Sequence, residues 1–152
     1  MVTKTKLADG RTRNRMRVLF LCTHNSARSQ MAEGLLRDLA GDRFEVFSAG
    51  TVTTRVRQEA ISVMAEVGVD ISAQESETLE RYLEEPLDLV ITVCDDANEA
   101  CPVFPGAGER LHWSFPDPST AAGGHEERLR AFRIVRDEIR ARIEGELVQT
   151  GA

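Results

Sequence analysis

Short apolar runs alternate with amphipathic stretches along the chain, and four of these runs are typical of buried β-strands. The run over residues 87–93 is apolar at nearly every position, which is typical of a central strand in a parallel sheet. The other three strands are predicted at residues 18–21, 44–47 and 110–115.

Between the strands, apolar positions recur every three or four residues, which predicts amphipathic helices. In the stretch that begins at Ser29, the side chains of Met31, Leu35 and Leu39 share one helical face. Gly68 is placed to end the following helix. The remaining helices are predicted at residues 58–67, 76–82 and 126–147. This alternation of strand and helix predicts an α/β fold, in which a four-stranded parallel sheet is flanked by helices on both faces.

The chain has 152 residues, which is enough for one domain with a sizeable core. Residues 1–16 are rich in lysine and arginine and have no apolar core, so we expect a flexible basic tail and not a secretory signal. Residues 17–152 are then a single catalytic domain. A formal net charge of −6 argues against binding to nucleic acid or to an anionic membrane surface.

The cellular setting follows from similar evidence. No apolar run approaches the length of a membrane span, and we expect a cytoplasmic protein, a monomer, whose three cysteines are reduced. In such a compartment cysteines are more often reactive than structural.

The most informative chemistry lies between the first strand and the first helix, where Cys22 and Arg28 are separated by five residues. Unpaired backbone N–H groups at a helix N-terminus bind oxyanions and stabilise a thiolate, and an arginine adds a planar pair of donors. Asn25 tolerates a left-handed backbone, and Ser26 and Ser29 offer hydroxyl donors. The candidate oxyanion-binding residues are Thr23, His24, Asn25, Ser26, Ala27, Arg28 and Ser29.

The alternative is that Cys22 is an inert buried cysteine and Arg28 an ordinary first-turn residue. The pair fixes only two positions, but its placement between a strand and a helix favours a nucleophilic site. Neither a Walker nucleotide loop nor a G-x-G-x-x-G dinucleotide motif is present.

Two further cysteines, Cys94 and Cys101, follow the third strand. Cys94 ends its strand as Cys22 does, so both lie at the same edge of a parallel sheet. On a helix, Cys94 and Cys101 would be about 10 Å apart. A disulfide needs Cα atoms within about 7 Å, so a bond between them requires the segment to bend or unwind. Zinc binding is disfavoured by the long spacing and by the scattered histidines, whereas incidental buried thiols remain an open alternative.

Asp117 lies between two prolines just after the fourth strand. A carboxylic acid near the cysteine could protonate an oxygen that leaves the oxyanion. Proline–aspartate–proline could instead be a rigid turn, since both residue types favour turns. The position opposite the cysteine loop favours the acid.

These residues together resemble the low-molecular-weight tyrosine phosphatase fold, and more specifically its thioredoxin-coupled arsenate reductase branch. The resemblance rests on the run from Cys22 to Gly34, on Ser48-Ala49-Gly50-Thr51, and on the run from Asp88 to Cys94. It continues through Cys101-Pro102 and through the run from His112 to Pro118.

The resemblance implies that Cys22 attacks arsenate, that Asp117 protonates the departing hydroxide, and that Cys94 and then Cys101 carry the resulting disulfide to thioredoxin. It implies no tightly bound cofactor. Members of the branch can bind potassium, and Asn25, Glu33 and Ser48 match part of such a site. Some relatives have a second cysteine before the arginine, where this chain has Ala27. His24 stands where a small residue is common, and we expect it to line the mouth of the loop.

Two rival functions stay open. A tyrosine phosphatase needs Cys22, Arg28 and Asp117 but neither of the other cysteines. Phosphatases of this fold usually place tyrosines beside the acid, but here Pro118, Ser119 and Thr120 follow it. A non-catalytic oxyanion-binding or redox-sensing protein is the second rival, and it would need neither the acid nor a complete set of three thiols.

Overall fold

A four-stranded parallel sheet forms the centre of the computed structural model, which describes residues 5–6, 12–13, 15–94, 104 and 107–148. The spatial order of the strands is β4-β3-β5-β6, so the apolar strand β5 lies inside the sheet as predicted. The strands are β3 (Met16–Cys22), β4 (Phe44–Gly50), β5 (Leu87–Thr92) and β6 (Ala107–His112).

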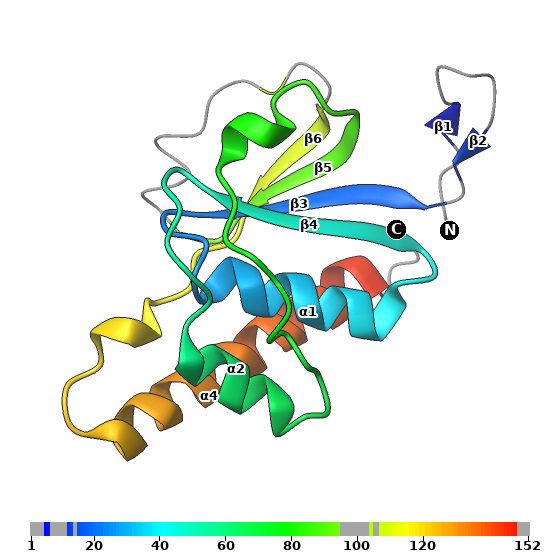
Figure 1. Cartoon of the computed structure of the whole chain (residues 1–152). Helices are drawn as coiled ribbons and strands as arrows, with labels where there is room; N and C mark the ends of the chain where they lie inside the picture. The colour runs from blue at the N-terminus through cyan, green and yellow to red at the C-terminus, as the bar shows by residue number, and fades with distance from the viewer. Residues whose placement is uncertain (1–4, 7–11, 14, 95–103, 105–106, 149–152) are drawn as a thin grey trace.

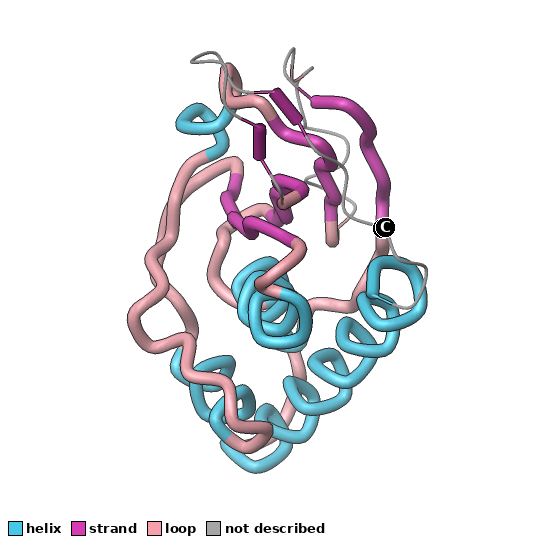
Figure 2. The backbone as a smooth tube through the Cα atoms, turned by 90° about the vertical axis from the view of Figure 1, so that its right-hand side faces the viewer, coloured by secondary structure: helices cyan, strands magenta, loops and turns pink. Residues whose placement is uncertain are grey.

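The long helices cover one face of this sheet, as Figures 1 and 2 show from two directions. They are α1 (Arg28–Ala40), α2 (Gln58–Ala65) and α4 (His125–Ile143), and α4 continues into the π-helical turn η3 (Glu144–Val148). Among the described residues, the helix on the other face is the single 3-10 turn η1 (Leu79–Tyr82). A second 3-10 turn, η2 (Pro118–Thr120), precedes α4.

Two apolar cores result, one on each face of the sheet, because successive side chains of a strand point to opposite faces. On the helical face, Phe20 and Ile91 pack with Met31 of α1 and Ile139 of α4. On the other face, the core is closed by η1 and by Phe104. The predicted parallel sheet with its amphipathic helices is therefore confirmed.

Some details differ from the sequence prediction: the helix predicted at residues 76–82 is the short 3-10 turn η1, and β6 begins at Ala107 and not at residue 110. The fourth strand ends at His112 and not at residue 115, because Trp113 and Phe115 are buried side chains that lie beyond the strand pairing. The N-terminal segment includes an antiparallel pair, β1 (Thr5–Lys6) with β2 (Thr12–Arg13), which the sequence did not predict.

The carboxyl ends of the strands are aligned at one edge. Cys22 is paired with Gly50, Leu21 with Thr92, and Thr92 with His112. Ligands of such sheets bind at this edge, and the candidate residues that follow β3, β5 and β6 gather here. None of the helices in the described ranges is both long enough and apolar enough to cross a membrane.

Candidate active site

The loop between β3 and α1 is held in shape by the buried side chain of Asn25. Its backbone has φ +49°, the left-handed conformation that the sequence suggested. The side-chain nitrogen donates to the hydroxyls of Ser29 and Ser48, each at 2.9 Å. The side-chain oxygen accepts from Gln30 Nε2 at 2.9 Å and from the backbone N–H of Glu77 at 2.8 Å. Because both polar atoms of its side chain have partners, Asn25 holds the loop in place.

Helix α1 begins at Arg28, one residue earlier than predicted, and presents its first turn to this loop. Its N-cap residue is Ala27, which gives the helix no side-chain cap, and the first turn has no acidic residue. The first-turn N–H groups and the positive end of the helix dipole are therefore placed to form the anion cradle that the sequence predicts.

Arg28 is anchored by the chain that follows β6. One of its terminal nitrogens donates to the carbonyl of Phe115 at 3.0 Å, and the other lies 3.8 Å from Asp117 Oδ2. Its Nε is buried and has no hydrogen-bond partner among the described residues. A buried donor of this kind has a free N–H for an anion.

The thiols of Cys22 and Cys94 are both buried, and they share a hydrogen bond. Thr23 Oγ1 also lies 3.3 Å from Cys94 Sγ. The hydrogen bond to Cys94 and the burial of the thiol raise the pKa of Cys22, while the positive charge of Arg28 acts in the opposite direction. The sequence had suggested a stabilised thiolate at Cys22. In this arrangement the contact with Cys94 acts against that stabilisation.

Asp117 reaches the same site from the turn after β6. Burial acts to raise its pKa, but the hydroxyl and N–H of Ser119, together with the charges of Arg28 and Arg57, hold the pKa of Asp117 below its usual value. The predicted proximity of the acid to the cysteine loop is confirmed by its contact with Arg28.

The residues predicted for potassium lie together and hydrogen-bond to one another. Ser48 accepts from the amide nitrogen of Asn25 and donates to Glu33 at 2.5 Å. The second oxygen of Glu33 is bound by Arg37. A potassium ion needs oxygen ligands, and the Ser48 and Glu33 oxygens that would serve it take part in these hydrogen bonds. The potassium site stays a prediction. Within the described ranges, no group of three histidine, cysteine or acidic side chains could hold a metal ion. Cys101 lies outside the described residues.

The mouth of the loop opens into a pocket of about 270 Å³, hereafter the mouth pocket. His24 is exposed there, as expected. The lining residues are His24, Ser26, Thr54, Arg55, Arg57 and Ser119.

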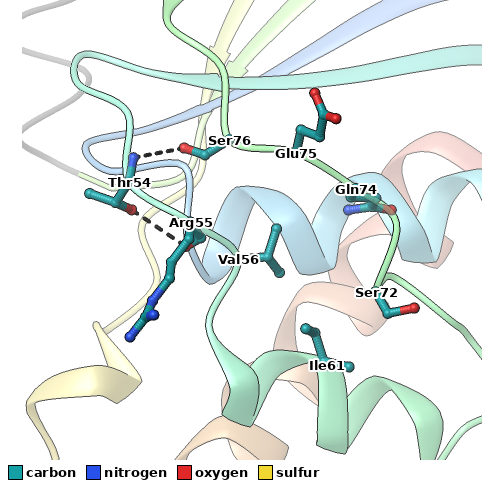
Figure 3. A pocket seen from close by; sticks show the side chains of 8 residues that line it. All are labelled: Thr54, Arg55, Val56, Ile61, Ser72, Gln74, Glu75 and Ser76. Atoms are coloured by element: carbon teal, nitrogen blue, oxygen red, sulfur yellow. Dashed lines mark hydrogen bonds between the residues drawn. The ribbon is translucent and has the colours of Figure 1, made fainter.

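A larger groove of about 480 Å³ lies beside the mouth pocket (Figure 3). The Thr54 N–H donates to Ser76 Oγ at 3.0 Å across its upper end. Figure 3 shows Arg55 extending away from the other labelled side chains of this groove, which leaves its charge outside it.

Three residues that the site depends on were missed by the sequence analysis: Gln30, Gly50 and Ser119. Gln30 donates to the distant Glu75 carbonyl as well as to Asn25, and Gly50 approaches the loop from β4; no local pattern reveals such long-range contacts. Ser119 had a readable signal, because a serine two residues after an aspartate is typical of a turn in which the carboxylate accepts hydrogen bonds.

A cysteine at a strand end, an arginine at a helix N-terminus and an aspartate across from them define an enzyme that handles oxyanions through a thiol. Residues 17–150 match the model of the low molecular weight phosphotyrosine protein phosphatase family. The chain belongs to this family.

Within the family, the similar proteins that were found include arsenate reductases. The chain is 47% identical to the arsenate reductase of Halalkalibacterium halodurans over 130 residues, which are 86% of this chain and 94% of that protein. A solved structure of an arsenate reductase in the phosphate binding state has a TM-score of 0.76 and 34% identity, and the match covers 88% of this chain and 98% of that chain. A thioredoxin-dependent arsenate reductase of Corynebacterium glutamicum has a TM-score of 0.63 and 28% identity, over 91% of this chain and 64% of that chain.

Proposed function

We propose that this chain is an arsenate reductase that works by a three-cysteine relay and is recycled by thioredoxin. The observation that carries the proposal is the contact between the thiols of Cys22 and Cys94 at the anion-binding edge of the sheet. A phosphatase of this fold has no use for a second thiol there. The similar arsenate reductases and the thioredoxin-dependent neighbour support the same reading.

In the first step, arsenate lies in the loop, held by the N–H groups of the first turn of α1 and by Arg28. The sulfur of Cys22 attacks arsenic, the S–As bond forms, and one As–OH bond breaks. Asp117 gives a proton to the departing hydroxide, which leaves as water. The thiol proton of Cys22 passes to solvent as the S–As bond forms, and Asp117, having given its own proton to the leaving oxygen, takes one back from solvent, so protons balance over the step.

In the second step, the sulfur of Cys94 attacks the sulfur of Cys22, and the electron pair of the S–As bond stays on arsenic. Arsenic(V) becomes arsenic(III) and leaves as arsenite, while the two thiols together lose two electrons and form the Cys22–Cys94 disulfide. Cys101 then attacks Cys94 and releases Cys22. The dithiol of thioredoxin then reduces the Cys94–Cys101 disulfide and is itself oxidised to a disulfide.

Phosphatase activity is the second candidate, because the family is named for it and because Cys22, Arg28 and Asp117 suffice for it. The turn after the acid presents Pro118, Ser119 and Thr120, and not an aromatic ring. Tyr82, the only tyrosine of the chain, is buried against Phe47 on the opposite face of the sheet. We therefore expect weak hydrolysis of aryl phosphates as a side activity.

The decisive measurement is arsenate-dependent NADPH oxidation with thioredoxin and thioredoxin reductase, repeated with a glutaredoxin system. We expect Cys22→Ser to abolish both arsenate reduction and aryl phosphate hydrolysis, because both begin with the same sulfur. Cys94→Ser should lose catalytic arsenate reduction and keep the hydrolysis. The two variants are matched, since each changes one buried sulfur to oxygen.

Near wild-type arsenate reduction by Cys94→Ser would contradict the relay and favour the phosphatase. Turnover with glutaredoxin but not with thioredoxin would leave the relay intact and replace its reductant. The cytoplasmic location and the monomeric state stay predictions.

A further inference from the structure

The two oxygens of the Asp117 carboxylate have different partners. Oδ1 accepts a hydrogen bond from Ser119 Oγ at 2.7 Å and another from the Ser119 N–H at 3.0 Å. Oδ2 lies 3.8 Å from the guanidinium of Arg28. We propose that Ser119 is a positioning residue for the acid: its hydroxyl holds Oδ1 so that Oδ2 faces the leaving oxygen beside Arg28. This inference rests on the proposed role of Asp117.

The turn does not need the hydrogen bond from the Ser119 hydroxyl to Asp117 Oδ1. Asp117 is the N-cap of η2, and the Ser119 N–H alone completes such a cap. The neighbouring hydroxyl, Thr120 Oγ1, donates at 2.9 Å to the backbone carbonyl of Asp117 and therefore serves the turn. Only the Ser119 hydroxyl among these two is directed at the charged group.

Ser119 also lies beside the catalytic loop, since it lines the mouth pocket with Ser26 and Arg57. A chain of contacts runs from the Phe115 carbonyl to Arg28, from Arg28 to Asp117, and from Asp117 to Ser119. The segment that follows β6 therefore positions both the anion-binding arginine, Arg28, and the acid, Asp117.

The hydroxyl also decides which oxygen carries the proton. Because Ser119 Oγ donates to Oδ1, a proton on the carboxyl group is directed to Oδ2. Burial acts to raise the pKa of Asp117 and the Ser119 hydroxyl acts against it. Removing the hydroxyl therefore moves the deprotonation of Asp117 to higher pH.

The test compares Ser119→Ala with Thr120→Ala, which removes a hydroxyl from the same turn. Hydrolysis of phenyl phosphate, whose leaving group needs a proton, is measured beside hydrolysis of p-nitrophenyl phosphate, whose leaving group needs it much less. We expect Ser119→Ala to lower kcat for phenyl phosphate roughly tenfold, the order expected when one hydrogen bond to a charged group is lost. KM should change little, and the alkaline limb of the pH profile should move to higher pH. Thr120→Ala should follow the wild type, and Ser119→Thr should restore both kcat and the limb.

A double-mutant cycle completes the test, because Ser119→Ala should add nothing once Asp117→Asn has removed the acid. The proposal is overturned if Ser119→Ala equals the wild type, if Thr120→Ala has the same effect, or if the loss persists in Asp117→Asn. Aryl phosphates keep this outcome separate from that of the arsenate assay. If the wild type hydrolyses phenyl phosphate but does not reduce arsenate, the proposed reductase fails and the Ser119 comparison is still decided.

Discussion

Asn25 connects the catalytic loop to three other parts of the chain. Its side chain bonds to α1 through Ser29 and Gln30, to β4 through Ser48, and to the segment before η1 through Glu77. All of these bonds are buried or partly buried, so water is a poor substitute for a lost partner. The backbone of Asn25 adds a second demand, since φ +49° suits asparagine better than most residues.

Asn25→Ala is therefore expected to destabilise the protein by about 2–4 kcal/mol, because it leaves buried donors unpaired and puts alanine in a left-handed conformation. Equilibrium unfolding in urea measures the change. Gln58→Ala, at the exposed start of α2, is the control and should shift the free energy of unfolding by less than about 0.5 kcal/mol. Equal stability of the two variants would show that the Asn25 bonds are dispensable.

At the scale of single residues, the sequence revealed the residues that carry the chemistry better than the groups that hold them in place. Cys22, Arg28 and Asn25 could be read from a short run between a strand and a helix. The Phe115 carbonyl that anchors Arg28 lies 87 residues away, and the Glu77 N–H that holds Asn25 lies 52 residues away. Contacts over such separations depend on the tertiary fold, and a backbone donor or acceptor has no residue type to mark it.

Among the elements, the end of β4 shows how closely two segments must approach to build the site. A Cβ atom on Gly50 would lie 2.7 Å from the carbonyl oxygens of Thr23 and Val52 and 2.8 Å from the Asn25 nitrogen. All three are backbone atoms, so no side chain can rotate away. Strand β4 can therefore support the catalytic loop only with glycine at this position.

Gly50→Ala is expected to displace the loop, to cost about 1–3 kcal/mol in stability, and to reduce kcat for arsenate and for aryl phosphates together. Gly145→Ala is the matched control, because a Cβ there meets nothing within 4 Å. Thermal unfolding and steady-state kinetics measure the two effects. Wild-type activity in Gly50→Ala would mean that the loop tolerates the displacement.

The elements themselves were largely predictable, because the apolar periodicity of α1, α2 and α4 and the apolar run of β5 are strong signals. The end of β6 was not, since Trp113 and Phe115 continue the apolar pattern past the last strand pair. The pairing of β1 with β2 was also missed. Each of these strands is two residues long, which is too short to show alternation.

On the scale of the whole molecule, positive charge is concentrated at the mouth pocket although the chain is acidic overall. The formal net charge is −6, yet Arg55 and Arg57 line the mouth pocket, with Arg28 beyond them in the anion cradle. Among the described residues that line this pocket, none is acidic. Local positive charge at a cleft concentrates anions there even when the molecule as a whole repels them. Arsenite is neutral near pH 7, so the same charges have little hold on the product.

Replacing Arg55 and Arg57 together by glutamine is expected to lower kcat/KM for arsenate about 3- to 10-fold at low ionic strength. The difference should shrink as salt is added, since salt screens charges over about 10 Å at 0.1 M. Arg130→Gln, on the exposed side of α4, removes a positive charge away from the pocket and serves as the control. A salt-independent loss would instead indicate direct binding by the two arginines.

The burial of the Cys22 and Cys94 side chains has a consequence for how the protein meets electrophiles. An alkylating reagent larger than a tetrahedral oxyanion reaches these sulfurs only when the surrounding structure opens. The rate at which iodoacetamide or a maleimide labels them, compared with the rate in unfolded chain, therefore reports how often that opening occurs. Protection of these sulfurs against a bulky organic electrophile thus comes in part from the depth at which the thiols are held.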